Sequence, residues 1–128
     1  MPIKLNAIEM GQPGIAGGGD KKYYARANTD GEVTLEGLSK TIARMSTVSG
    51  TDVLAVLHAL VEVMTDGLAD SKNMRLGDLG SLRVSISSEP RDNKEDINGS
   101  VVRGSRVIFT PGKKIRNMLK TLEFVKNN

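Results

Sequence analysis

The sequence predicts a small α+β protein. Apolar residues spaced three and four apart run from Thr34 to Met45 and again through residues 50–69, which is the pattern of buried helix faces. Residues 81–88 alternate apolar and polar side chains as in a half-buried strand, and residues 100–109 return as a second strand. The order is therefore helix, helix, strand, glycine turn, strand, polar segment, strand and basic helix.

Composition limits the possible classes of protein. The chain has 128 residues and 38% hydrophobic content, enough for one domain, and its 3% aromatic share makes the expected core aliphatic. The absence of cysteine excludes disulfide frameworks, thiolate metal sites and cysteine nucleophiles. No apolar run reaches signal-peptide length or the roughly 20 residues of a membrane span. We therefore expect a cytoplasmic protein without a membrane partner.

The N-terminal segment predicts a β-hairpin. Residues 2–10 alternate like a strand, with an expected break in register at Ile8 and Met10. Five glycines and a proline in residues 11–22 predict a loop without regular structure, and residues 23–27 resume as a second strand.

The central helix is the strongest element of the sequence. Ser49 and Asp52 resemble a capping box, with aspartate in place of glutamate, at the start of helix 50–69. Apolar residues cover more than one face of this helix, which favours burial by a second copy in a homodimer. A central helix in a larger monomer is the competing interpretation. His58 is interpreted as a core or interface histidine, because the chain has no second histidine to share a metal ion.

A long hairpin follows this helix. We expect a strand at residues 74–79, a reversal at Gly80, an outgoing strand at 81–88 and a returning strand at 100–109. The polar segment 89–99 has almost no apolar side chains, so the tip should project from the core and move.

The last helix predicts an anion site at its start. Thr110 can cap a helix whose first position is Pro111, and Gly112, Lys113 and Lys114 follow in the first turn. Free backbone N–H groups, the positive end of the helix dipole and two ammonium groups would then meet at one place, where a phosphate would fit.

Positive charge is concentrated at the C-terminal end. The net charge is only +3, but residues 101–128 hold seven basic side chains and one acidic one, a net charge of +6. Such asymmetry points to a polyanion partner, although a solvated helix face would also explain it. The last helix, which is expected to start at Pro111, should end near residue 122, and Phe124 and Val125 are expected to add a short tail.

Taken together, these motifs resemble the HU and integration host factor family of bacterial DNA-binding proteins. The resemblance covers residues 34–122 and is carried by the segments 76–84 and 107–114 together with the order of elements. The N-terminal hairpin and the Asp-Leu-Gly-Ser sequence resemble the longer HU-related proteins of Bacteroides. The resemblance implies an HU-like domain at residues 33–125 behind an extension at 1–32.

The family resemblance also implies an architecture and a partner. It implies an intertwined homodimer with a three-stranded antiparallel sheet, a β-arm at about residues 85–105 and a body that grips the phosphates of double-stranded DNA in the nucleoid. It implies no cofactor, no metal, no catalytic residue and no small-molecule substrate. The expected DNA-binding residues, matched by position or by positive charge, are Arg75, Gly80, Ser81, Arg83, Arg103, Arg106, Gly112, Lys113, Lys114, Arg116 and Lys120.

The arm departs from the family pattern. Members that kink DNA carry arginines along the arm and an Arg-Asn-Pro tip with an intercalating proline. Here the outgoing strand carries serines, Pro90 lies early in the arm, and residues 89–96 hold four carboxylates against two basic side chains. Repulsion between these carboxylates and the DNA phosphates predicts that the protein bends DNA only weakly.

Enzymatic functions are not supported by the sequence. The spacing from Gly14 to Gly19 is that of a phosphate loop, but Asp20 stands in place of the required lysine. One histidine and no cysteine leave no usual nucleophile and base pair. The predicted function is an architectural DNA-binding dimer with weak sequence selectivity. The alternative is a non-enzymatic dimer of the same fold whose acidic arms bind a protein partner.

Overall fold

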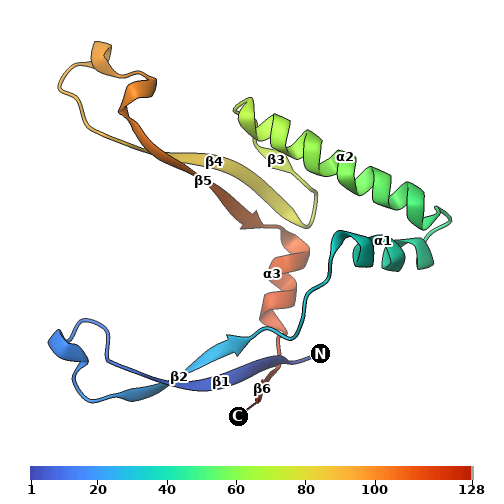
Figure 1. Cartoon of the computed structure of the whole chain (residues 1–128), viewed down its shortest axis with the longest axis horizontal. Coiled ribbons are helices and arrows are strands. Elements are labelled where there is room, and N and C mark those ends of the chain that lie inside the picture. The colour runs from blue at the N-terminus through green and yellow to red at the C-terminus, as the bar shows by residue number, and fades with distance from the viewer. Residues whose placement is uncertain (128) are drawn as a thin grey trace. The chain divides into compact units, whose positions relative to one another are not determined.

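The computed structural model describes residues 1–127, which form three α-helices and six β-strands (Figure 1). The helices are α1 (Leu35–Arg44), α2 (Gly50–Ala69) and α3 (Lys113–Lys120). The strands are β1 (Ile3–Met10), β2 (Lys22–Asn28), β3 (Met74–Arg75), β4 (Gly80–Ser88), β5 (Val102–Pro111) and β6 (Phe124–Lys126). This mixture confirms the expected α+β class.

The chain folds into two compact units. One contains residues Met1–Thr34 together with the C-terminal residues from Met118 onward, and the other contains Leu35–Asn117. Each unit has its own three-stranded sheet, in the order β2-β1-β6 in the first and β3-β4-β5 in the second.

The first unit contains the expected hairpin and one strand that the sequence did not predict. β1 and β2 pair antiparallel without interruption as far as the pair Met10 and Lys22, so the predicted register break at Ile8 is wrong. The loop between them is also more regular than expected, because Ala16–Gly18 form a 3-10 turn. Past α3, the expected tail forms β6, which pairs parallel with β1.

An ion pair connects the start of the hairpin to the segment after it. Lys4 Nζ donates a hydrogen bond of 2.7 Å to Asp30 Oδ2. This hydrogen bond and the lysine charge lower the pKa of Asp30 below its ordinary value.

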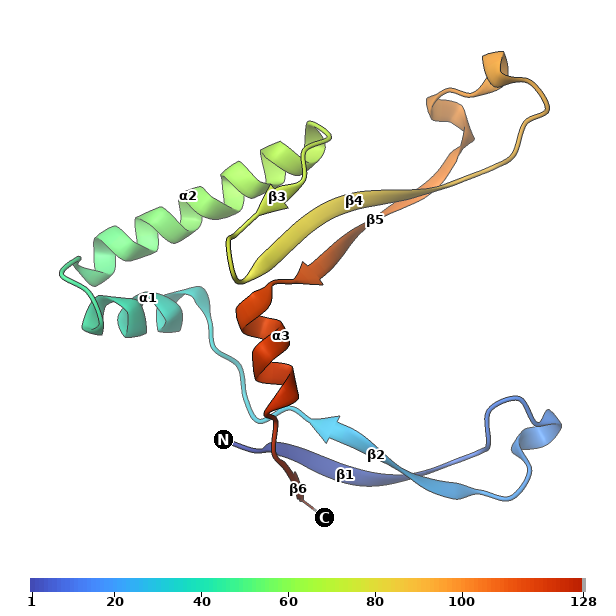
Figure 2. The same ribbon diagram turned by 180° about the vertical axis from the view of Figure 1, so that it is seen from behind.

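Helices α1 and α2 of the second unit form as the sequence predicts. The Ser49 side chain accepts a hydrogen bond of 3.3 Å from the backbone N–H of Asp52, which is one half of the expected capping box. α2 then runs over the expected range and packs against α1 (Figure 2).

The sheet of the second unit carries most of its polar side chains on one face. β4 and β5 pair antiparallel, so that Ser81 lies opposite Thr110, Leu82 opposite Phe109 and Arg83 opposite Ile108. Because side chains alternate between the faces of a strand, Leu82, Val84, Ile86, Val107 and Phe109 share one face of the hairpin. The other face, which we call the polar face, carries Ile108 together with the polar residues Ser81, Arg83, Ser85, Arg106 and Thr110.

The turn before β4 lies earlier than predicted. A strand was expected over residues 74–79, but β3 ends at Arg75 and residues 76–79 form the turn. Leu76 N donates to Gly80 O at 2.8 Å, and Leu79 N donates to Leu76 O at 3.0 Å. Gly77, with φ of +53°, takes the left-handed conformation that glycine adopts without strain. Gly80 therefore does not make the reversal and instead begins β4.

The bounds of β5 and α3 also differ from the prediction. β5 continues through Thr110 to Pro111, so Thr110 pairs within the sheet and does not cap the helix. The helix starts at Lys113, two residues later than expected. Between β4 and β5, the connection at residues 89–101 is shaped by two 3-10 turns, Lys94–Asp96 and Gly99–Val101.

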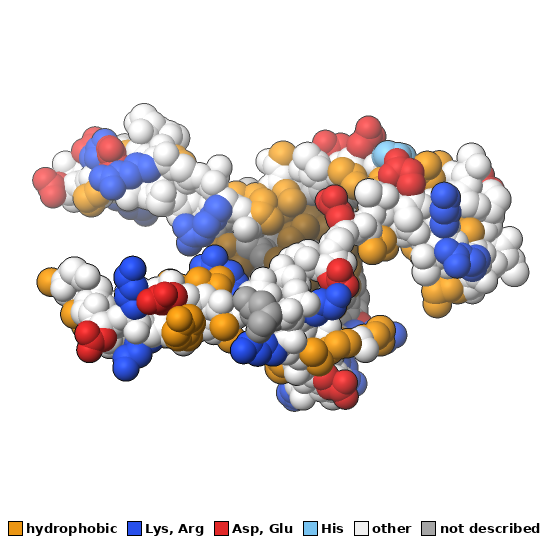
Figure 3. Space-filling view, turned by 60° about the horizontal axis from the view of Figure 1, so that its bottom comes forward, with side chains coloured by type: hydrophobic (Ala, Val, Ile, Leu, Met, Phe, Trp, Pro, Cys, Tyr) orange, Lys and Arg blue, Asp and Glu red, His pale blue; other side chains and the backbone are white. Residues whose placement is uncertain are grey.

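A single copy of the chain buries very little. Among the described residues, the buried apolar side chains are Val53, at 7% exposure, and Val101, at 3%. Val56, Val61 and Val63 of α2 remain more than half exposed, and Figure 3 shows apolar side chains across the visible surface.

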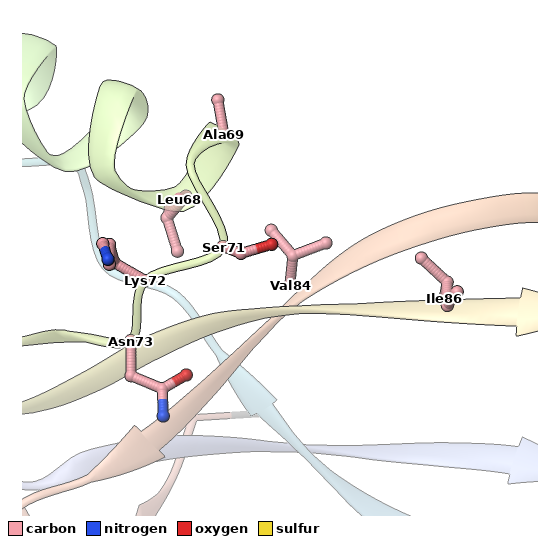
Figure 4. Close-up of a pocket in the computed structure, with 7 residues that line it drawn as sticks. All are labelled: Leu68, Ala69, Ser71, Lys72, Asn73, Val84 and Ile86. Atoms are coloured by element: carbon pink, nitrogen blue, oxygen red, sulfur yellow. The ribbon is translucent and has the colours of Figure 1, made fainter. Parts of the chain in front are cut away.

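A hollow in the second unit lies between the end of α2 and β4. It measures about 420 Å³, and Leu68, Val84 and Ile86 contribute apolar side chains to it (Figure 4). Val84 and Ile86 are 43% and 56% exposed. The apolar face of the hairpin is therefore left without a complete cover in one copy of the chain.

Candidate nucleic-acid interface

A second hollow lies where the turn before β4 meets the start of α3. It measures about 280 Å³ and includes Gly80, the first residue of β4, and Gly112, the residue before α3. Six of the eleven predicted DNA-binding residues line it: Arg75, Gly80, Ser81, Gly112, Lys113 and Arg116. Gly77, Asp78, Thr110 and Pro111 complete the lining. We call this hollow the α3 pocket.

Backbone hydrogen bonds hold the walls of the α3 pocket together. Gly112 N donates to Leu79 O at 2.9 Å, and Lys114 N donates to Asp78 O at 3.1 Å. A Cβ on Gly112 would press against the carbonyl of Asp78 and lie 2.8 Å from the amide nitrogen of Gly80. The absence of a side chain at Gly112 thus allows the turn and the helix start to approach each other closely.

These bonds correct part of the predicted anion site. The N–H groups of Gly112 and Lys114 are used by the turn, so they are not free for a ligand. Within the described residues, the amides of Lys113 and Ile115 make no backbone hydrogen bond. Two donors therefore remain at the positive end of the helix dipole, next to two lysine side chains.

The charge of the α3 pocket is positive. Arg75, Lys113 and Arg116 are exposed, and none of them forms an ion pair within residues 1–127. Asp78 is the acidic residue of the lining. Cations at a helix N-terminus oppose the helix dipole, so an anion in the pocket would relieve that repulsion.

The polar face of the sheet adjoins the α3 pocket. Ser81 and Thr110 belong to both, because they form a cross-strand pair at the pocket end of the hairpin. Further along the same face, Arg83 lies opposite Ile108 and Arg106 lies opposite Ser85, which makes the two arginines diagonal neighbours. The structure thus brings eight of the predicted residues into one continuous region.

The remaining predicted residues include one with an acidic partner. Lys114 is exposed in the first turn of α3, and Lys120 lies in the last turn. Arg103 lies in the arm, and its Nε is 3.5 Å from Glu89 Oε1.

Sequence reasoning missed Thr110 and Asp78 as pocket residues. Thr110 was assigned to a helix cap, and its alternation with Val107 and Phe109 was the signal that could have placed it on the strand. The carbonyl contacts of Asp78 have no local sequence signal, because they depend on how the turn meets α3.

Two other features are absent from the described residues. No helix in residues 1–127 is long and apolar enough to cross a membrane. In the same part of the chain, no three His, Cys, Asp or Glu side chains gather in a way that could hold a metal ion.

Comparison with known families matches this architecture. The model of the family described as "HU domain fused to wHTH, Ig, or Glycine-rich motif" (HU-HIG) matches residues 1–126. The chain belongs to the HU-HIG family. This confirms the resemblance to HU-related proteins, and the match extends over the N-terminal hairpin as well as the helices and the second sheet.

A solved structure shows the same fold as this HU-HIG chain. It is named "putative bacterial DNA binding protein" and comes from Bacteroides vulgatus ATCC 8482. The similarity has a TM-score of 0.64 and 15% sequence identity over 98% of this chain. It covers 49% of the other chain, so this chain spans about half the length of that protein. No curated protein matches the chain.

Proposed function

We propose that this HU-HIG protein binds double-stranded DNA through its phosphate backbone, with weak sequence selectivity and an architectural role. The observation that carries the proposal is the continuous region formed by the α3 pocket and the polar face. Arg75, Lys113 and Arg116 converge in the pocket, and Arg83 and Arg106 continue the positive charge along the sheet.

The chemistry of this region suits phosphate better than bases. Lysine and arginine side chains, a serine and a threonine hydroxyl, and backbone amides at a helix start are the groups that contact DNA phosphates in proteins. Such contacts release counterions and carry no sequence information directly. Weak selectivity follows from this set of groups.

We also propose that the protein acts as a homodimer. Exposed Val56, Leu60 and Val63 lie four and three residues apart on α2 and so share one face. Together with the open apolar face of the hairpin, they form an exposed apolar surface, which is the kind of surface that marks protein–protein interfaces. A second copy that covers this surface would supply the core that one copy lacks.

The domain division and the non-enzymatic role belong to the same proposal. Residues 33–125 would supply the DNA-binding domain, and residues 1–32 the extension. The similar protein from Bacteroides vulgatus is itself named as a DNA-binding protein, which supports the assignment of the partner. The candidate region offers positive charge and hydrogen-bond donors, which are what binding of a phosphate requires.

Binding to two duplexes of unrelated sequence and equal length tests the proposal. Fluorescence anisotropy at low salt should show binding to both, with affinities within about tenfold of each other, because phosphate contacts dominate. Failure to bind either duplex would favour the alternative in which acidic arms bind a protein partner. A strong preference for one duplex would reject the weak selectivity while keeping DNA as the partner.

A further inference from the structure

Three charged side chains meet where the arm leaves the sheet. Glu89 Oε2 lies 3.1 Å from Arg91 Nη2, and Glu89 Oε1 lies 3.5 Å from Arg103 Nε. One carboxylate therefore pairs with two guanidinium groups, using a different oxygen for each. Figure 3 shows acidic and basic side chains interspersed at the far end of the β4–β5 hairpin.

The backbone holds Glu89 and Arg103 in this arrangement. Glu89 N donates to Val101 O at 2.9 Å, and Val101 is 3% exposed. The register shifts at the end of the hairpin, because Ser87 pairs with Gly104 but Ser88 pairs with Val102. Arg103 is the extra residue of this bulge, and a bulge redirects the side chain that it carries.

The three groups stay accessible to solvent. The side chains of Arg91, Glu89 and Arg103 are 39%, 41% and 62% exposed. Exposed ion pairs contribute little to stability, so removing the carboxylate should free both guanidinium groups without unfolding the arm. The acidic residues of the same segment that form no ion pair within the described residues are Asp92, Glu95 and Asp96.

We propose that Glu89 masks Arg91 and Arg103 from DNA by acting as an intramolecular competitor for phosphate. The inference rests on the proposed DNA-binding function. It assigns Glu89 a role that general repulsion does not explain, because its carboxylate pairs directly with the two guanidinium groups that a phosphate would otherwise meet. Arg91, which the sequence did not single out, becomes a second latent phosphate contact beside Arg103.

Substitution Glu89→Gln tests the mask. Freeing two arginines per protomer should raise the affinity for duplex DNA and steepen the salt dependence. The slope of log affinity against log salt should become more negative by about 0.9 for each arginine that gains a phosphate. Glu95→Gln is the matched control, because it makes the same charge change in the same segment without breaking an ion pair.

Two arginine variants complete the test. Adding Arg91→Ala and Arg103→Ala to Glu89→Gln should return the slope to the wild-type value, while the same two changes in the wild-type chain should alter it little. Thermal unfolding of each variant should show that the fold is retained.

The outcomes separate the mask from the proposed function. Equal slopes for Glu89→Gln and Glu95→Gln would overturn the mask and leave DNA binding in place. The mask would also be overturned if the slope of log affinity against log salt became shallower when the two arginines are removed from the wild-type chain. That result would mean that both arginines already contact phosphate. If neither the wild-type protein nor any variant binds duplex DNA at low salt, both the proposed function and the mask are rejected.

Discussion

Gly112 connects the local fold to the candidate site. Its missing side chain lets the carbonyls of Leu79 and Asp78 accept hydrogen bonds from the start of α3. These bonds place Lys113 and Arg116 in the same pocket as Arg75. Small changes at this position should therefore affect stability and DNA binding together.

Replacing Gly112 with alanine should destabilise the protein by about 1–3 kcal/mol, because the new methyl group forces the turn away from the helix start. Urea unfolding followed by circular dichroism measures the difference. Gly99→Ala is the control, since a Cβ at Gly99 would meet no atom within 4 Å and its φ is not positive. Equal stability of the two variants would contradict the close approach at Gly112.

The two lysines at the start of α3 should contribute to binding more than to folding. The double substitution Lys113→Ala and Lys114→Ala removes cations that oppose the helix dipole, so stability should change little. Duplex affinity should fall at least tenfold at low salt, with a salt slope shallower by about 0.9 for each lost contact.

A second lysine pair gives the matched control for this prediction. Lys21 and Lys22 are adjacent and exposed but lie at the start of β2, outside the candidate region. Their replacement with alanine makes the same charge change and should weaken binding much less. An equal loss in both double variants would assign the binding to overall charge instead of the α3 pocket.

Among the elements, those defined by local sequence were predicted best. Helix α2 has its expected range because the Ser49 cap and the apolar spacing are local signals. The strand β6 was missed, since a three-residue strand gains its structure from pairing with the distant β1. The helix start at Lys113 was misplaced because Pro111 fits a first helical turn as well as the end of an edge strand.

The charge of the β4–β5 arm predicts a small contribution to binding. Replacing residues 90–98 with a short turn should preserve the affinity within a few-fold, because the segment removed carries more acidic than basic side chains. Energy transfer between the ends of a labelled duplex should show little bending by the intact protein. Strong bending that disappears with the deletion would show instead that the arm inserts into DNA.

At the level of the assembled protein, the thin core of one copy predicts coupling between association and stability. The melting temperature should rise with protein concentration, since the proposed dimer would bury the face of α2 that one copy exposes. Val56→Asp should weaken dimerisation by about tenfold or more, because it places an unpaired carboxylate in the interface.

Sedimentation velocity across a range of protein concentrations would measure this association. Thr51→Asp makes the same charge change at an exposed polar position of α2 and serves as the control. A wild-type protein that stays monomeric, with a melting temperature independent of concentration, would contradict the dimer.

The candidate site was predicted in composition but not in shape. Positive charge and the Gly-Lys-Lys sequence pointed to the start of α3, and six predicted residues do line one pocket. The meeting of this helix with the turn at residues 76–79 could not be predicted, because it depends on contacts between segments more than thirty residues apart. The pairing of Arg103 with Glu89 across the arm is a tertiary contact of the same kind.

The salt dependence of duplex binding is the most direct test of a phosphate-contacting protein. Anisotropy titrations of the wild-type protein between 50 and 200 mM salt, about the range over which such contacts are resolved, give the slope of log affinity against log salt. With Arg75, Arg83, Arg106, Lys113, Lys114 and Arg116 available in each protomer, we predict a steep negative slope of about −0.9 for each phosphate contacted. Duplex binding that is absent at low salt, or whose affinity does not change with salt, would contradict the proposed function.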